Sequence, residues 1–255
     1  MSFRFKQFFI EDSKCAMKVG TDGVLLGAWT PIDRFSDRIQ VESCLEGAKN
    51  TKYRILDVGT GSGLIARMLM QRCPEAVVEG IDIDKAAVEQ ARENGVNAFC
   101  SSLQEWQMVN GKCPDGTLYD LIVSNPPYFQ NSLKNPDKGR ELARHTDSLP
   151  FEELIKHSTR LLRKEGQVAL ILPAEAEEEI RMIAARYSLY CTRVTRVYSK
   201  VGKPARRVLM AFERVQSTEY RIQTELPFQD DVLVLEDEKG GRSAAYSELT
   251  KDFYL

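Results

Sequence analysis

The sequence predicts an α/β fold with a mostly parallel seven-stranded sheet, an antiparallel last strand and an N-terminal hairpin extension. Three observations predict this fold. Short apolar runs alternate with helical segments between residues 53 and 186, a pattern typical of βαβ units. A glycine-rich loop joins the first of these runs to the first helix. The last two predicted strands have no helix between them, so they should form a hairpin that makes the final strand antiparallel.

The size of the chain suits one domain with additions. Its 255 residues, 43% of them hydrophobic, can form one substantial core. We expect a central domain over 53–216, with an N-terminal extension over 1–52 and a C-terminal tail over 217–255 packed on it. The net charge of −2 means that RNA or DNA would have to bind at local basic patches.

The composition also bounds cofactors and location. The six cysteines include no C-x-x-C pair and there are only two histidines, so we expect no metal site. The thiols are expected to be reduced and mostly buried, as in a cytoplasmic protein. The start of the chain lacks a secretory h-region and no run of 18 apolar residues occurs, so we expect no membrane segment.

The N-terminal extension is expected to hold a hairpin, a helix and a linker. Glu11-Asp12-Ser13 indicates the hairpin turn, and Thr21 with Asp22 supplies an N-cap signal for the helix. The expected elements are strands over 3–10 and 14–19, a helix over 23–29 ended by Pro31, and a polar linker over 32–52 with a short helix near 41–48.

The central domain shows the regular alternation. The expected strands are 53–58, 77–81, 96–100, 119–123, 167–172, 190–198 and 207–212. The expected helices are 64–72, 85–94, 151–162 and 174–186. The tail after residue 217 is mixed and charged, and three aromatic residues mark its end.

Polar motifs follow four of the strands. Asn125-Pro126-Pro127-Tyr128 directly follows one apolar run, and its two prolines stiffen the turn and remove backbone donors. In an open α/β sheet the carboxyl ends of strands are where ligands bind. An amide side chain, a free carbonyl and an aromatic face would therefore converge at a binding edge. A rigid turn with a packed tyrosine is the alternative.

A second motif is the loop Asp57-x-Gly59-x-Gly61-x-Gly63, between a strand and a helix. Glycines there allow positive φ and close approach of a ligand to the backbone. The preceding carboxylate disfavours a pyrophosphate and tolerates a cationic or zwitterionic ligand. Asp82 ends the next strand, about 20 residues on, where an acid holds a ribose diol. Ser102 and Leu103 follow the third strand, where an adenine ring would sit, and a serine hydroxyl or a backbone amide can serve it.

Together these residues resemble the class I S-adenosylmethionine-dependent methyltransferases, which have a Rossmann-like fold. The resemblance implies that the glycine loop holds the methionine moiety of the cofactor and that Asp82 holds its ribose. It also implies that Asn125-Pro126-Pro127-Tyr128 serves methyl transfer to a planar-amide or aromatic amino nitrogen, and that Asn125 contributes to cofactor binding as well.

Further segments extend the resemblance over nearly the whole chain. The runs FKQF at 5–8, CAMKVGTDGVLLGAW at 15–29 and DFYL at 252–255 are similar to the bacterial tRNA(Val) adenine-N6 methyltransferases. That family modifies the adenine 3′ of the anticodon, so the resemblance implies a tRNA anticodon stem-loop as partner. It also implies that Lys18, Thr21 and Asp22 border the cofactor pocket. Helix capping and surface charge are the alternative roles for these three residues. We expect the protein to be a monomer.

The chemistry suits the catalytic motif. An exocyclic amine is a poor nucleophile because its lone pair is delocalised into the ring. Acceptance of its hydrogens by the Asn125 side-chain oxygen and the Pro126 carbonyl would localise that lone pair without a strong base. Tyr128, with Phe129, would stack on the extruded base.

Three groups of basic residues are candidates for phosphate contacts, with a solvated surface as the alternative for each. We expect His145 to be an ordinary loop histidine. The groups are Lys134, Lys138, Arg140 and Arg144; Lys200, Lys203, Arg206 and Arg207; and Arg4, Lys6, Lys14 and Lys18.

Three other functions remain open. Glutamine N5-methylation of a release factor uses the same motif, but such enzymes usually carry an N-terminal helical domain, whereas aromatic strands are expected here. A DNA adenine methyltransferase would need room for a target-recognition domain. A non-catalytic adaptor that binds S-adenosylmethionine would not need the intact loop, Asp82 and Asn125 together.

Overall fold

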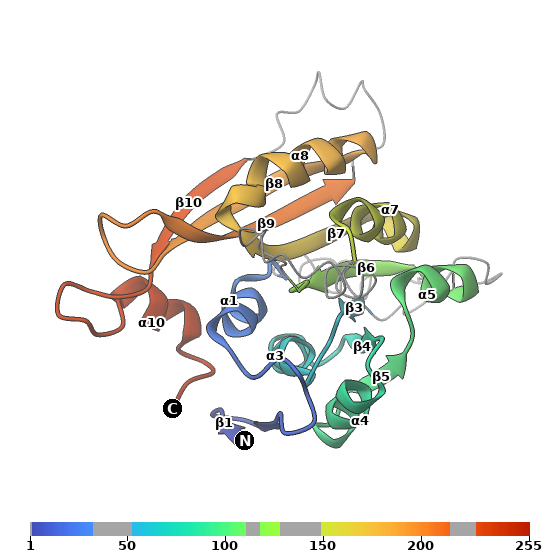
Figure 1. Cartoon of the computed structure of the whole chain (residues 1–255), viewed down its shortest axis with the longest axis horizontal. Helices are drawn as coiled ribbons and strands as arrows, with labels where there is room; N and C mark the ends of the chain where they lie inside the picture. Colours follow the sequence, from blue (N-terminus) through green and yellow to red (C-terminus); the bar gives the residue numbers. More distant parts are fainter. Residues whose placement is uncertain (1, 33–52, 111–117, 128–148, 215–227) are drawn as a thin grey trace, which may run out of the picture.

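A computed structural model describes residues 2–32, 53–110, 118–127, 149–214 and 228–255. Its centre is an eight-stranded sheet with the order β10-β8-β9-β7-β6-β3-β4-β5 (Figure 1). The strands are β3 (Arg54–Val58), β4 (Val77–Asp82), β5 (Asn97–Cys100), β6 (Tyr119–Ser124), β7 (Leu162–Pro173), β8 (Leu189–Tyr198), β9 (Ala205–Arg214) and β10 (Gln229–Val234).

The direction of the strands confirms the predicted α/β class. β9 runs antiparallel to both of its neighbours, β7 and β8, and the other five pairs in the sheet are parallel. The prediction of seven strands was wrong by one, because β10 pairs with β8 as a further edge strand. Its first four residues are exposed and two of them are Asp230 and Asp231, so its sequence lacks the apolar alternation that indicates a strand.

Helices cover both faces of the sheet (Figure 1). Buried residues of the two faces form separate clusters, one under each layer of helices. One layer contains α1 (Thr21–Trp29), α3 (Leu64–Arg72), α4 (Lys85–Glu93) and α10 (Ala244–Thr250). The other contains α5 (Leu103–Asn110), α7 (Phe151–Leu161) and α8 (Glu177–Arg186), the last preceded by the 3-10 turn η1 (Ala174–Ala176).

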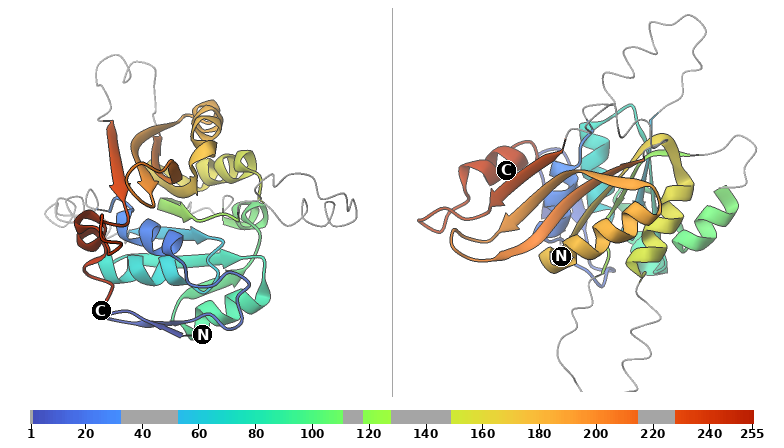
Figure 2. Two further views of the ribbon diagram at one scale, coloured as in Figure 1. Left: turned by 60° about the vertical axis from the view of Figure 1, so that its left-hand side comes forward. Right: turned by 90° about the horizontal axis from the view of Figure 1, so that it is seen from above.

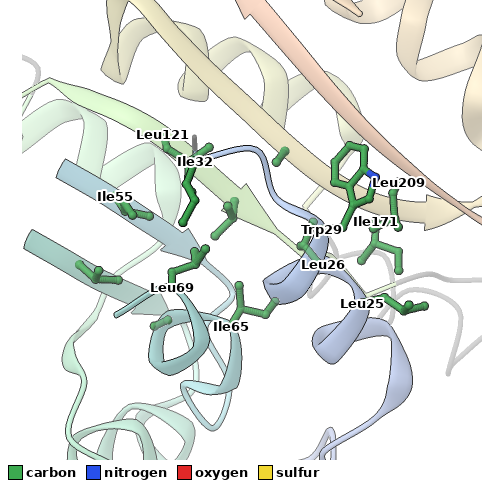
Figure 3. Packing of buried hydrophobic residues seen from close by; sticks show 14 of the residues in the cluster. Leu25, Leu26, Trp29, Ile32, Ile55, Ile65, Leu69, Leu121, Ile171 and Leu209 are labelled. Carbon is green, nitrogen blue, oxygen red and sulfur yellow. The ribbon is translucent and has the colours of Figure 1, made fainter. Parts of the chain in front are cut away.

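The core beneath α1 and α3 fixes α1 against the sheet. Leu25, Leu26 and Trp29 of α1 face apolar side chains of α3 and of the sheet (Figure 3). The Trp29 indole nitrogen donates to the Thr195 hydroxyl at 2.8 Å, which satisfies the only polar atom of that side chain. A Cβ on Gly27 would lie 2.6 Å from the Met68 sulfur, so the glycine permits the close approach of α1 to α3.

The N-terminal hairpin differs from the expected one. β1 (Ser2–Arg4) and β2 (Phe9–Glu11) pair within the single strand predicted over 3–10, and their turn lies at Phe5–Phe8 rather than at residues 11–13. Phe5 and Phe8 turn inward into a small cluster with the C-terminal Phe253. The Lys6 amide donates to the Phe253 carbonyl at 2.8 Å, so the two ends of the chain lie together (Figure 2). The predicted strand over 14–19 is irregular.

Other boundaries differ for local reasons. α1 begins at Thr21 with Gly20 as its N-cap, so Thr21 and Asp22 do not cap it. α7 passes directly into β7, whereas the predicted helix over 151–162 and strand over 167–172 left a connection between them. α5 and α10 were not predicted. The predicted helix near 41–48 lies outside the described residues. Among the described helices, none is long and apolar enough to span a membrane.

Candidate active site

The order of the strands reverses between β3 and β6. From β3 the chain builds outward through β4 and β5 on one side, whereas β6 and β7 extend the sheet on the other. Ligands bind at such a reversal, outside the carboxyl ends of the strands. Val58 pairs with Ser124, and the Ser124 hydroxyl donates to the Val58 carbonyl at 2.8 Å. The glycine loop after β3 and Asn125 after β6 therefore leave the sheet side by side.

The glycine loop is an open backbone cradle. Gly59 and Gly61 have φ of 71° and 55°, and nothing lies within 4 Å of a Cβ built on either one. A side chain at these positions would be strained and would project into the open space over the loop. Gly63 has φ of 81° and is the N-cap of α3. The loop thus presents backbone without side chains, as a ligand that lies against the chain requires.

Asp57 stabilises the glycine loop through buried hydrogen bonds. Its carboxyl is fully buried and accepts hydrogen bonds from the Thr60 hydroxyl at 2.8 Å and from the Ala66 amide at 3.2 Å. Its other oxygen, Oδ1, is buried and has no hydrogen-bond partner among the described residues. Burial raises the pKa of this carboxyl to about 7, and the charge of Asp82 adds to the effect. Asp57 is thus placed to order the loop, with one acceptor left over.

Asp82 connects the end of β4 to the glycine loop. Its Oδ2 accepts from the Gly61 amide at 2.9 Å, and its Oδ1 accepts from the Asp84 amide at 3.0 Å. Each carboxylate oxygen keeps a second lone pair for a further donor. The neighbouring Asp84 has a separate role: its side chain accepts from the Ala86 amide at 2.9 Å and caps α4.

The segment after β2 is bound to α4 and to the glycine loop. Asn94, buried at the end of α4, accepts from the Glu11 amide at 3.0 Å and donates to the Glu11 carbonyl at 2.7 Å. The same Nδ2 donates to the Ser62 carbonyl at 2.8 Å. One amide side chain therefore joins the N-terminal extension to the glycine loop.

Residues 12–20 continue this contact toward Asp82. Burial, with a contribution from the charge of Asp82, raises the pKa of the Cys15 thiol to about 11. The Lys18 ammonium donates to the carbonyls of Asp12 at 2.7 Å and Cys15 at 2.9 Å, so it closes the loop on itself. Thr21 is exposed in the first turn of α1. The structure therefore brings this segment beside the glycine loop. Lys18 stabilises the segment through hydrogen bonds to its backbone.

Ser102 and Leu103 follow β5 but have local partners. Ser102 and Glu105 form a reciprocal cap at the start of α5: the Ser102 amide and hydroxyl donate to the Glu105 carboxylate, and the Ser102 hydroxyl accepts from the Glu105 amide. Leu103 is buried in the core. The more accessible surface at this end of the sheet is Ile83, next to Asp82, whose side chain is 59% exposed. An exposed branched side chain offers an apolar face to a planar ring.

The turn after β6 is only partly described. Asn125 is half-buried, Pro126 is buried and Pro127 is exposed. All six residues of β6 are buried, so Asn125 extends from a rigid central strand. Tyr128, Phe129, His145 and the basic group over 134–144 lie outside the described residues.

Two residues at this site escaped the sequence analysis, Asn94 and Ile83. Asn94 precedes Gly95 and has the signature of a simple helix C-cap, so nothing in the sequence indicated its contact with Glu11. Ile83 carried a weak signal, since an apolar residue directly after a strand-ending acid is exposed at the binding edge. Among the described residues, no group of three or more His, Cys, Asp and Glu side chains could hold a metal ion.

Comparison with known sequences identifies the family of this chain. Residues 41–186 match the family model of the methyltransferase small domain. Proteins of Bacteroides fragilis (39% identity) and of Phocaeicola vulgatus and Parabacteroides distasonis (both 42%) align with 99% of this chain and 97% of their own length. Each is named tRNA1(Val) (adenine(37)-N6)-methyltransferase.

Solved structures share the fold at lower identity. A predicted O-methyltransferase of Agrobacterium tumefaciens matches with a TM-score of 0.58 and 16% identity, over 91% of this chain and 96% of its own. A 16S rRNA methyltransferase of T. thermophilus, solved with AdoMet and guanosine, matches with a TM-score of 0.51 and 17% identity, over 84% of this chain and 50% of its own. These likenesses show the Rossmann-like fold of class I methyltransferases.

Proposed function

The chain belongs to the family of bacterial tRNA1(Val) (adenine(37)-N6)-methyltransferases, and from that membership we propose that it methylates N6 of adenine 37 in a valine tRNA. The observation that carries the proposal is that the glycine loop, Asp82 and Asn125 lie at the point where the strand order reverses between β3 and β6. Each lies at the carboxyl end of a different strand, and the fold brings them to one edge of the sheet.

The described residues fit S-adenosylmethionine as the cofactor. The open backbone at Gly59 and Gly61 would hold its methionine part, and the spare lone pairs of the Asp82 carboxylate would accept from its ribose hydroxyls. Ile83 would support the adenine ring with its exposed side chain, a role expected earlier for Ser102 and Leu103. When bound, the cofactor supplies the methyl group as an electrophile.

Asn125 and Pro126 prepare the nucleophile. The side-chain oxygen of Asn125 and the Pro126 carbonyl would accept the two hydrogens of the adenine amine, which localises the nitrogen lone pair. No strong general base is then required, because the proton leaves after positive charge has formed on the nitrogen. Tyr128 would hold the extruded base by stacking.

The anticodon loop is a suitable substrate because its bases are already partly unpaired, which lowers the cost of extrusion. Full-length similarity to tRNA methyltransferases favours RNA over a release-factor glutamine, and the complete set of loop, acid and amide disfavours an adaptor without activity. We propose that the enzyme acts as a monomer in the cytoplasm, where its tRNA substrate occurs, and without a metal.

Methyl transfer from labelled cofactor to total tRNA of a strain that lacks this gene tests the proposal. The expected product is N6-methyladenosine, found after nuclease digestion in the anticodon-loop fragment of valine tRNA. Wild-type tRNA, which already carries the modification, is the matched control and should accept little label. Labelling of protein glutamine in place of tRNA, or no labelling at all, would overturn the proposal.

A further inference from the structure

The turn between β8 and β9 lies on the same edge of the sheet as the proposed active site. Ser124 of β6 pairs with Leu170 of β7, and both strands run toward the catalytic edge. β9 runs in the opposite direction, so its first residues pair with the last residues of β7, as Arg207 does with Pro173. The β8–β9 turn therefore projects from the edge that carries Asn125, and it is the orange loop at the left of Figure 1.

Four basic residues lie in this turn and at the start of β9, and we call them the cationic tip: Lys200, Lys203, Arg206 and Arg207. Two of them hold the turn in place. The Lys200 ammonium lies 2.9 Å from the Glu236 carboxylate, just after β10, and the Arg207 guanidinium donates to Asp22 of α1 at 2.8 Å. Backbone bonds add to this, since the Glu236 amide donates to the Ser199 carbonyl at 3.0 Å.

The other two cations of the tip are available to a ligand. Lys203 and Arg206 are exposed, and neither side chain has a partner within the part of the chain that the structure describes. The cationic tip thus combines a fixed backbone with two free positive charges. Free charges on a fixed support lose little conformational freedom when they bind an anion.

The N-terminal group of basic residues has a different arrangement. Lys6 donates to the Lys251 carbonyl at 2.5 Å, Lys14 donates to Glu93 at 2.6 Å, and Lys18 donates to backbone carbonyls of its own loop. These three charges are committed to partners within the molecule, and Arg4, the fourth member of the group, is exposed at the end of β1. Of the two basic groups that the structure describes, the cationic tip is the better phosphate contact.

We propose that Lys203 and Arg206 bind backbone phosphates of the tRNA anticodon arm beside the adenine that is methylated. The inference rests on the proposed function and identifies a surface for its substrate. Neighbouring strands are about 4.8 Å apart, and β9 and β8 lie two and three strands from β6. The tip is then roughly 10–15 Å from Asn125 along the edge, within reach of the nucleotides that flank an extruded base.

The test is the salt dependence of tRNA binding by the double variant Lys203→Ala/Arg206→Ala. Loss of two phosphate contacts should weaken binding roughly tenfold at 0.1 M salt and reduce the slope of log K against log salt by about 1–2. S-adenosylmethionine affinity and kcat at saturating tRNA should stay at the wild-type values, because neither residue touches the reacting groups.

Arg160→Ala/Lys164→Ala is the matched control, because it removes the same charge from exposed residues at the opposite edge of the sheet, where α7 meets β7. It should keep the wild-type slope. Equal slopes for the wild type and the tip variant would overturn the inference, and so would an equal reduction in both double variants. Failure of the wild type to methylate tRNA would instead overturn the proposed function. If the alanine variant loses cofactor binding, Lys203→Gln/Arg206→Gln repeats the comparison.

Discussion

Asp82 accepts a hydrogen bond from the backbone amide of Gly61, with 2.9 Å between Oδ2 and the nitrogen. The acid at the end of β4 therefore holds the glycine loop of β3 in addition to facing the proposed ribose site. Because one carboxylate does both, its loss should affect the two halves of the cofactor site together.

Asp82→Ala should weaken S-adenosylmethionine binding by roughly 1–3 kcal/mol, through the loss of charge-assisted bonds to the ribose and of the loop contact. Calorimetric titration measures the affinity. Asp84→Ala is the control: it removes only the cap of α4, so it should lower stability by about 1 kcal/mol and leave the affinity unchanged. Wild-type affinity in folded Asp82→Ala would contradict this role.

Asn94→Ala should weaken cofactor binding indirectly. The substitution removes three hydrogen bonds that join Glu11 and Ser62 to the end of α4. At about 1 kcal/mol each, their loss should lower the free energy of unfolding by roughly 1–3 kcal/mol and raise the Kd for the cofactor several-fold. Urea unfolding and calorimetry measure the two effects.

Glu89→Ala, on the exposed side of the same helix, removes only a solvent-exposed ion pair with Lys14 at 3.9 Å, so it should change neither quantity. Asn94→Asp separates the bonds, because it keeps the acceptor for the Glu11 amide and loses the donor to the Glu11 and Ser62 carbonyls. Wild-type cofactor affinity in both Asn94 variants would show that the N-terminal segment does not support the loop.

Asn125→Ala should reduce the rate of the methyl-transfer step. Loss of an electrostatic group aimed at developing charge costs about 10²–10³ in rate, so single-turnover methyl transfer should fall by that factor. The affinity for S-adenosylmethionine should be nearly unchanged, because Asp82 and the glycine loop remain. Transfer to tRNA adenine at the wild-type rate would leave Asn125 as a turn residue only.

Two variants of Tyr128 distinguish a stacking role from a role in proton transfer. Tyr128→Ala should lose base stacking worth roughly 1–3 kcal/mol, and Tyr128→Phe should retain most of the activity. Single-turnover rates at saturating tRNA make the comparison. A Phe variant as slow as the Ala variant would indicate that the hydroxyl itself takes part in the reaction.

Asp57 should make stability depend on pH. Its pKa is raised from 3.8 to about 7 in the folded protein. Between these two pH values the carboxyl is protonated in the folded state and ionised in the unfolded state. Its contribution to stability is therefore fully present below pH 4 and is lost as the pH rises to about 7. Asp57→Asn imitates the protonated carboxyl and removes this dependence.

Urea unfolding at several pH values measures the effect as the difference between Asp57→Asn and the wild type. The unfolding free energy of the variant should rise relative to the wild type between about pH 4 and pH 7 and level off above that. Other carboxyls titrate equally in both proteins and cancel. A constant difference across the range would show that the Asp57 carboxyl is ionised in the folded protein.

The elements of the central domain could be predicted because their patterns are local. α3 has the predicted bounds of 64–72, and β4, β5 and β6 differ from prediction by one residue at one end. Apolar strands, capping residues and glycines act over a few neighbours, so the sequence alone shows them. The family resemblance came from the same kind of evidence, because its motifs are contiguous.

The wrong elements depend on distant partners. The aromatic residues of 3–10 have the propensity of a strand, yet Phe5 and Phe8 turn inward because Phe253, at the other end of the chain, completes their cluster. β10 forms a strand because its backbone pairs with β8, which would otherwise be the last strand of the sheet. The acidic sequence of β10 does not itself indicate a strand. Such contacts cannot be read from a window of neighbouring residues.

By itself the sequence determined the α/β class, the order of the central strands and helices along the chain, and the residues that follow each strand. Only the tertiary structure decided their assignments in space: Asn94 joins Glu11 to the glycine loop, Ser102 caps α5, and Lys18 closes its own loop. Only the pairing of β9 with β7 places Arg206 and Lys203 on the edge of Asn125. The physical reason is that backbone propensity and apolar periodicity act over a few residues, whereas side-chain hydrogen bonds and charge pairs join whatever the fold brings together.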